Sequence, residues 1–212
     1  LMDNFSNTSG YASLVKKVYP KLKLKVFGGL IMEPPSGGVN YENAKISLNY
    51  SYFGNDGAKF ISFPTHHTRH IAKLENRKKD YIKNCFYVPD SGPTAETKKI
   101  LRLIAKKNIV LNTGHLSAKE TINLVKCAKK IGVKKILIPS NTFNLKTISK
   151  LKSFKVKFEF SYFFVSKATE VPLTHVDGEK HKIQGTNENL LKLLIKTAGP
   201  KNVILSSDCG VS

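Results

Sequence analysis

The feature that most constrains the fold is a regular alternation of short apolar runs with amphipathic stretches. Six runs are typical of strands: residues 23–31, 58–63, 108–112, 135–139, 156–163 and 202–207. Helical spacing separates them, most clearly over 95–107, where residues 100, 101, 103, 104 and 105 are apolar. Apolar strands separated by helices predict a parallel sheet with helices on its outside.

The helix over 118–131 has clear signals at both ends. Ser117 and Glu120 form a capping box before it, and Gly132 ends it. Further helices are expected over 8–19, 40–53, 144–153 and 187–197, whereas 64–94 and 164–185 are expected to be long loops. Both loops follow strands, where barrel enzymes carry their chemistry.

The strand count favours an α/β fold of the TIM-like (β/α)8 barrel type, in a distorted form. Residues 1–4 would be the tail of a seventh strand, and an eighth would precede Leu1. We therefore expect one barrel domain over 1–212, as a fragment that lacks the first strand and the C-terminal end. The alternative is an open doubly wound sheet, which predicts a glycine-rich phosphate turn, but the sequence has no GxGxxG or GxxxxGK[ST] motif.

Charge and cysteine content narrow the classes of partner. The chain has 35 Lys and Arg against 15 Asp and Glu, a net charge of +20. The lysines lie mostly as pairs on amphipathic helices, which favours a solvated surface over a nucleic-acid groove, although binding to a duplex remains a third hypothesis.

No apolar run is long enough to span a bilayer, so no membrane partner is expected. Three cysteines without a CxxC pair indicate neither a disulfide framework nor a thiolate zinc site, and they favour the cytoplasm. Assembly of identical copies is left open.

The candidate site residues lie at or after the C-terminal end of a predicted strand, except Glu159, which lies inside the strand predicted over 156–163. They are His66, His67, His70, His115, Glu159 and Asp208. In a barrel these ends converge on one mouth. Imidazole and carboxylate groups suit Zn²⁺ or a similar divalent ion, which lowers the pKa of a bound water to about 7. Asp208 would then take the proton from that water.

Simpler interpretations stand beside these. His66 and His67 are adjacent, so their side chains diverge and at most one faces a site. A histidine in a loop is more often a surface or hydrogen-bonded residue, which is the interpretation favoured for His175 and His181. In the simpler interpretation of Asp208, its carboxylate caps a helix that follows the last strand and has no catalytic role. Glu159 alternates with two phenylalanines and therefore points away from them, toward an interior where its charge needs a partner.

Five segments resemble, in order, the blocks of a poorly characterised amidohydrolase-like family of metal-dependent hydrolases. They are "VFGGLIMEPPSGGVN", "GAKFISFPT", "IVLNTGHLS", "GVKKILI" and "VILSSDCG". The resemblance implies a distorted β/α barrel related to amidohydrolases and PHP-type phosphoesterases. It also implies a divalent metal (Zn, Mn or Fe) held by an HxH pair on the first strand and by ligands on later strand ends. His115 matches the histidine of the TGHLS block, His70 a histidine after the PT turn, and Asp208 the aspartate of the last strand.

The sequence departs from this pattern at three places. The HxH pair is not present, Asn4 stands where a histidine is expected, and Ser140 stands where the histidine of a THP block is expected. We therefore expect Asn4 and Ser140, with His70, to hydrogen-bond a substrate. His115, His66, His67 and Glu159 are the expected metal ligands, and Asp208 is the expected catalytic residue.

The leading hypothesis is a metal-dependent hydrolase that activates water against an amide, lactone or phosphate ester of a small molecule. The alternative is a catalytically degenerate barrel that binds a small ligand or a partner without turnover.

Overall fold

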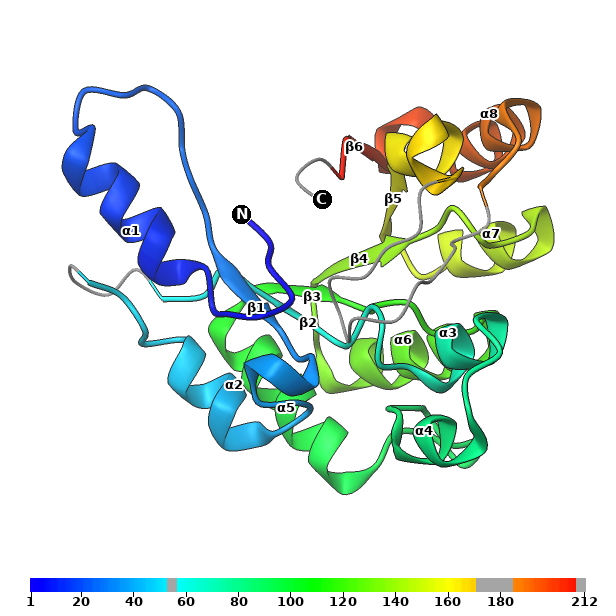
Figure 1. Ribbon diagram of the computed structural model, residues 1–212, viewed down its shortest axis with the longest axis horizontal. Helices are drawn as coiled ribbons and strands as arrows, with labels where there is room; N and C mark the ends of the chain where they lie inside the picture. Colours follow the sequence, from blue (N-terminus) through cyan, green and yellow to red (C-terminus); the bar gives the residue numbers. More distant parts are fainter. Residues whose placement is uncertain (53–56, 171–184, 209–212) are drawn as a thin grey trace.

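The computed structural model describes residues 1–52, 57–170 and 185–208 and contains one parallel sheet. Its strands are β1 Gly29–Ile31, β2 Phe60–Ser62, β3 Val110–Asn112, β4 Lys135–Pro139, β5 Lys157–Ser161 and β6 Val203–Ser206. They lie in the order in which they occur along the chain, β1 to β6, and every neighbouring pair is parallel (Figure 1). This confirms the parallel α/β fold.

Eight α-helices are described. They are α1 Ser9–Val18, α2 Tyr41–Ser47, α3 Arg69–Leu74, α4 Lys79–Asn84, α5 Ala95–Lys107, α6 Ala118–Ile131, α7 Leu145–Lys152 and α8 Glu188–Ala198. Short 3₁₀ helices span Pro34–Ser36, Tyr162–Val165, Lys167–Glu170 and Pro200–Asn202. Among the described residues, no helix combines the length and apolar character needed to cross a bilayer.

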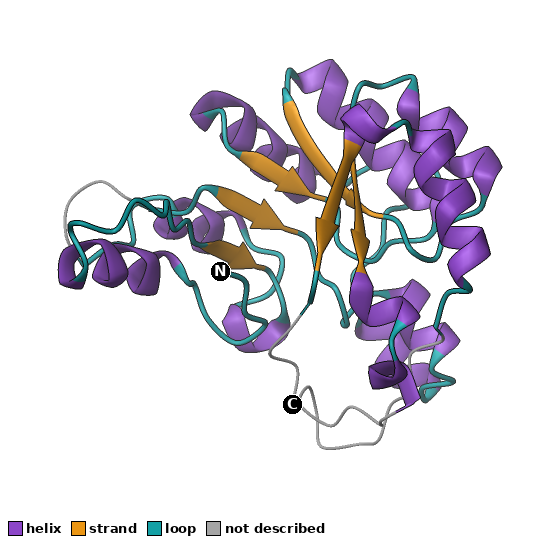
Figure 2. Ribbon diagram, turned by 90° about the horizontal axis from the view of Figure 1, so that it is seen from above, coloured by secondary structure: helices purple, strands orange, loops and turns teal. Residues whose placement is uncertain are grey.

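The sequential strand order rules out the doubly wound alternative, because that fold reverses direction at a switch point. Figure 2 shows the strands as a curved sheet with helices along its outside. The described strands do not close into a ring, since β1 and β6 are the two edges of the sheet. The order is that of consecutive β/α units of a barrel.

The core lies between the sheet and its helices. Ile61, Leu111, Ile138 and Phe158 come from four successive strands, and all are fully buried. They belong to the same cluster as the apolar sides of α5, α6, α7 and α8. The amphipathic periodicity that identified these helices in the sequence is therefore the pattern that forms the core.

Helix ends match the sequence most closely where a cap is encoded. Helices α5 and α6 have the predicted bounds, and the Ser117–Glu120 capping box is present in full. The backbone N–H of Ser117 donates to Glu120 Oε2 at 3.0 Å. The other oxygen of Glu120 accepts from the backbone N–H of Val88 at 3.1 Å, so the cap also holds the loop before α5. Gly132 ends α6 with φ of 100°, a left-handed conformation that glycine adopts without strain.

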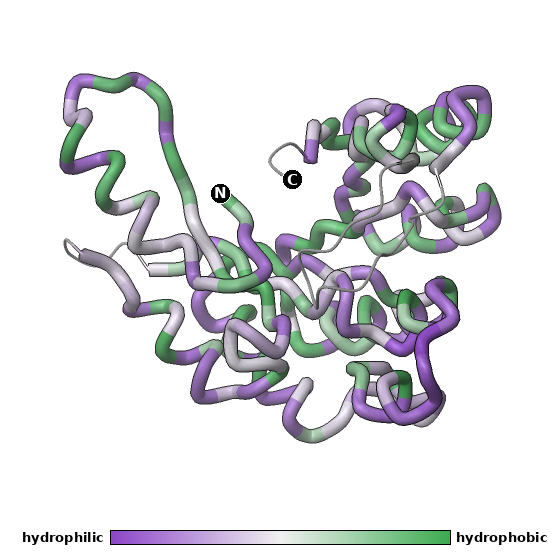
Figure 3. Tube along the Cα trace, in the orientation of Figure 1, coloured by the Kyte–Doolittle hydropathy of each residue, from purple (hydrophilic) through white to green (hydrophobic). Residues whose placement is uncertain are grey.

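Two strand predictions are wrong in extent. Residues 1–4 form no strand, because the outer edge of β1 is occupied by Thr8. The backbone N–H of Thr8 donates to the Gly29 carbonyl, and Gly29 N–H donates to the Thr8 hydroxyl, each at 3.0 Å. The run 23–31 is a strand only from Gly29. Its first part alternates Lys with apolar residues (Figure 3) but forms an exposed arm after α1.

Two helix predictions also differ from the structure. The helix expected over 40–53 ends at Ser47, whose carbonyl accepts a hydrogen bond from Ala58 N–H as the chain turns toward β2. The loop expected over 64–94 contains α3 and α4. Both are only six residues long and rich in Lys, Arg and Asp, so they lack an apolar period that a sequence could reveal.

We expect Ser117→Ala to lower the free energy of unfolding by about 1 kcal/mol, because it removes the acceptor for the first turn of α6. Ser117→Thr keeps the hydroxyl and should stay within about 0.5 kcal/mol of the unsubstituted protein. Urea unfolding followed by circular dichroism measures both. Equal losses for the two variants would show that the cap does not stabilise α6.

Candidate functional site

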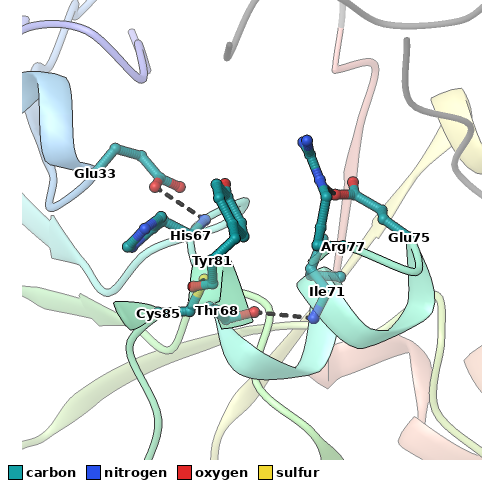
Figure 4. Close-up of polar contacts among 8 residues, drawn as sticks. All are labelled: Glu33, His67, Thr68, Ile71, Glu75, Arg77, Tyr81 and Cys85. Atoms are coloured by element: carbon teal, nitrogen blue, oxygen red, sulfur yellow. Dashed lines mark hydrogen bonds and ion pairs between the residues drawn. The ribbon is translucent and has the colours of Figure 1, made fainter. Parts of the chain in front are cut away.

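A buried carboxylate organises the turn that follows β2. Glu33, at the end of β1, is 1% exposed. Its Oε1 accepts from the backbone N–H groups of Thr65 and His66, both at 2.6 Å, and from the Thr65 hydroxyl at 3.0 Å. Its Oε2 accepts from His67 N–H at 3.1 Å (Figure 4). A buried charge needs such partners, so Glu33 fixes the backbone from which both histidines extend.

The two adjacent histidines point to different surroundings, as their adjacency predicts. His66 lines a cavity together with His70 and His115. His67 lies edge-on to the ring of Tyr81, with 5.3 Å between ring centroids, on the side of the turn where Figure 4 places Cys85. Burial lowers the pKa of His67, and the nearby Glu33 carboxylate opposes this shift.

Gly114 brings the turn after β3 into contact with the turn after β2. Its φ is +65°, and a Cβ at this position would collide with the backbone carbonyl oxygens of Pro64 and Phe63. The approach lets the backbone N–H of His115 donate to Pro64 O at 3.1 Å. The Thr68 hydroxyl donates back to His115 O at 2.9 Å. Only glycine permits this contact, which explains the residue before His115.

His115 is held in its neutral form. Burial, and then the neighbouring His70, lower the pKa of His115 to about 4, while a hydrogen bond with the backbone of Thr65 opposes the shift. Burial also lowers the pKa of His70, against the attraction of Glu120, and Lys73 adds to the lowering. Neutral imidazoles can accept a proton, donate a hydrogen bond or bind a metal.

The cavity has a volume of about 550 Å³ and lies at the C-terminal ends of β2, β3 and β4. Its polar side contains the three imidazoles of His66, His70 and His115. Its apolar surface comes from residues after these strands and from the first turn of α8: Ile71, Leu74, Leu116, Phe143, Phe164 and Leu190. Phe164 meets the His115 ring edge-on at 6.4 Å between centroids. The size is in the range of small-molecule sites.

Glu159 and Asp208 lie close to each other but do not line the imidazole cavity. Burial raises the pKa of Glu159, the nearby Ser206 hydroxyl opposes the shift, and the charge of Asp208 adds to it. Asp208 is exposed and has φ of 54°. Glu159 lies within β5 and Asp208 follows β6, whereas the imidazoles follow β2 and β3. We predicted that His115 and Asp208 would share one cavity, but Asp208 does not line the cavity that contains His115.

Asn4 and Ser140 make contacts within the protein. Asn4 Oδ1 accepts from the Thr65 hydroxyl at 3.2 Å, which places Asn4 beside the turn held by Glu33. Ser140 is fully buried, and its hydroxyl donates to Ile138 O at 2.7 Å. A role for either residue in substrate binding stays a prediction.

The described residues do not fit a complete metal centre. A catalytic zinc site uses three protein ligands and an open position. Over 1–52, 57–170 and 185–208, no three His, Cys, Asp or Glu side chains come together as ligands. His66, His70 and His115 share a cavity but do not form such a group. His175 and His181 lie outside the described residues.

Several residues of the site were not identified from the sequence. Asn141 joins the ends of β4 and β5, because its side-chain amide donates to Ser161 O at 3.1 Å and accepts from Ser161 N–H at 2.9 Å. The signal for Asn141 in the sequence is its position two residues after the end of the strand 135–139. Phe164 lies in the 3₁₀ helix Tyr162–Val165 and Glu75 caps the C-terminal end of α3, and neither had a signal in the sequence pattern.

Comparison with protein families gives one match. Residues 1–157 match the family described as "Family of unknown function (DUF6282)". The match covers most of the chain, which therefore belongs to this family. A comparison with curated proteins finds no match.

Solved structures give distant matches at a TM-score of 0.47 and 12% sequence identity. One is a lactonase engineered for organophosphate hydrolysis, another a variant of an organophosphorus hydrolase, and a third a variant of a PTE-like lactonase from Deinococcus radiodurans. The alignments cover 79% of this chain, and 45%, 44% and 45% of those chains respectively. The chain thus spans less than half the length of the structures it matches.

We expect the stability of the chelator-treated protein to fall between pH 6.5 and about 4 by an amount that depends on His115. The folded protein holds the pKa of His115 at about 4, below the ordinary histidine value of 6.5, so the unfolded chain binds the proton first as pH falls. The full shift corresponds to about 3 kcal/mol. The stabilising contribution is complete above pH 6.5 and is lost as pH falls through the folded pKa. Urea unfolding of the protein and of His115→Gln should give a difference that narrows across this window. A constant difference would contradict the buried neutral imidazole.

Glu33→Gln should lower the free energy of unfolding by about 2 kcal/mol or more, because an amide NH₂ would face the His67 N–H and one buried donor would lose its acceptor. Glu42→Gln is the matched control. Glu42 is exposed and pairs with Lys45 on the surface of α2, so its loss should stay within about 0.5 kcal/mol. Chemical denaturation of both variants is the measurement. Similar losses would show that the carboxylate does not hold the turn.

Proposed function

We propose that this member of a family of unknown function is a small-molecule hydrolase whose reaction takes place in the cavity of His66, His70 and His115. The observation that carries the proposal is that three imidazoles line one cavity at the C-terminal edge of a parallel sheet. Enzymes built from consecutive β/α units carry their chemistry at that edge. Ester, lactone and amide bonds are the candidate targets.

Each imidazole has a distinct part in the proposed reaction. His70 is partly buried and its pKa is lowered, so it is neutral at pH 7 and available to take a proton from an attacking water. His115 lies beside His70 in the cavity lining and is buried in its neutral form, so its ring nitrogens can donate or accept a hydrogen bond with the bound molecule. His66 extends from the backbone held by Glu33 and contacts the bound molecule.

A divalent metal would make a bound water more acidic. The imidazoles of His66, His70 and His115 line one cavity. Within the described residues, however, they are not arranged as a three-ligand metal group. We therefore derive the reaction from the imidazoles alone. The metal-ligand roles of His67 and Glu159 and the catalytic role of Asp208 stay predictions, since none of these side chains lines the cavity.

A second candidate function is ligand binding without turnover. It is favoured by Ser140, which replaces the histidine expected after β4 and whose hydroxyl bonds to Ile138 O. A protein that keeps the cavity but lacks the full donor set would bind the same small molecules and leave them unchanged.

Hydrolysis of 4-nitrophenyl butyrate tests the proposal. We expect His70→Gln to lower kcat/KM by about 10²- to 10⁴-fold, because it removes the proton acceptor. His67→Gln is the matched control, since His67 lies just before α3, which carries His70, but its ring packs against Tyr81. It should change kcat/KM by less than about threefold, since a side chain outside the cavity makes no contact with the transition state. Equal losses in both variants would contradict the assigned role of His70.

Metal content measured by mass spectrometry separates the alternatives. Metal-free protein that hydrolyses the ester supports the imidazole reaction. Stoichiometric metal that is absent from His115→Ala supports a metal-dependent reaction. Metal-free protein that binds an ester analogue without turnover supports the second candidate function.

A further inference from the structure

The cavity differs in charge from the rest of the molecule. The chain carries 35 Lys and Arg residues and a net charge of +20. Among the residues that the structure describes, the cavity lining contains no lysine and no arginine. A site for a phosphate or carboxylate group normally places a cation or a cluster of backbone N–H groups against the anion. The described lining presents no cation for such a group.

The charged residue in this lining is already paired. Glu75 accepts from Arg77 Nε at 3.0 Å, and the side chains are 7% and 6% exposed. The Arg77 guanidinium also lies 4.8 Å from the centre of the Tyr81 ring, and Figure 4 shows the three side chains together. The pair carries no net charge, and it is the Glu75 carboxylate that lines the cavity. An anion in the cavity would therefore face the carboxylate of this pair and not its guanidinium.

The N-terminus of α8 borders the cavity but offers few donors to an anion. Asn187 Oδ1 accepts from the backbone N–H groups of Asn189, at 2.8 Å, and Leu190, at 3.4 Å. Glu188 follows in the first turn of the helix and adds negative charge. The N–H groups that commonly bind a phosphate are therefore capped from within the chain.

Other polar groups at the cavity are also used internally. The side-chain amide of Asn141 is bonded to the backbone of Ser161 on both its donor and acceptor sides. The Thr186 hydroxyl donates to Asn141 O at 3.0 Å. The imidazoles therefore lie in a setting in which much of the remaining contact surface is apolar, including Phe143, Phe164 and Leu190.

We propose that the cavity takes an uncharged substrate with one polar reacting group, a neutral ester, lactone or amide, attached to an apolar chain or ring. The polar group lies against the imidazoles and the apolar part against the phenylalanines and leucines. Phosphate monoesters and free carboxylates are disfavoured by the described part of the lining, because each would lose its hydration there without gaining a cation. This inference rests on the proposed function for its site but concerns recognition, which can be measured without turnover.

Binding of a matched pair of ligands tests the inference. 4-Phenylbutanamide and 4-phenylbutanoate share a skeleton and differ in charge at pH 7.5. We expect calorimetry on the whole chain to show the amide binding about tenfold or more tightly. Equal affinity, tighter binding of the carboxylate, or no binding of either at the solubility limit would overturn the inference. Binding of the amide without hydrolysis of 4-nitrophenyl butyrate would leave the inference standing and contradict the proposed function instead.

Two substitutions on α8 test whether the preference for the uncharged ligand arises in this cavity. Leu190 lines the cavity, and Leu193, on the same helix, is 50% exposed and does not. Leu190→Arg should reverse the preference and bind 4-phenylbutanoate more tightly than the amide, whereas Leu193→Arg should keep the original ratio. A reversal in both variants would show that general surface charge sets the preference and would overturn the assignment to this cavity.

Discussion

The hydrogen bonds of the Glu33 carboxylate are the interaction on which the site depends. The carboxylate lies at the end of β1 and binds three successive backbone N–H groups after β2. The turn so fixed supplies the carbonyl of Pro64 to His115 after β3. Three strand ends are thereby joined through one buried charge, and the positions of His66 and His115 follow from it. Neutral imidazoles can gather there because the negative charge that orders them is already satisfied by backbone donors.

The sequence predicts those parts of the fold that depend on neighbouring residues. Helices α5 and α6 have the expected bounds because Thr94, Ser117 and Gly132 encode their ends locally. The strand 135–139 was also predicted with its observed bounds. The arm 23–28 resembles a strand in its alternation of Lys and apolar residues, but a strand also needs a partner, and the sequence does not show which neighbour is present. Helices α3 and α4 are short and highly charged, so they leave almost no periodic signal.

The sequence likewise predicts some parts of the candidate site and not others. Position after a strand was enough to select His66, His70 and His115, because adjacent parallel strands bring their ends together. It was not enough to place Glu159 and Asp208, since strand β4 stands between β3 and β5 in the sheet. Residue type was the weakest guide. Asn4 and Ser140 have polar side chains suited to ligands, but both make contacts inside the protein, and only the folded chain shows that their hydrogen bonds are made there.

The order of the strands has a consequence for how the chain acquires its structure. Each of the strands β2 to β5 pairs with the strand made just before it and the strand made just after it. Over the six described strands, a growing chain can therefore add one unit at a time, in the direction of synthesis, to a sheet that already exists. Under this arrangement the histidine cavity takes shape late, once α8 has emerged and its first turn closes over strand ends that were assembled earlier.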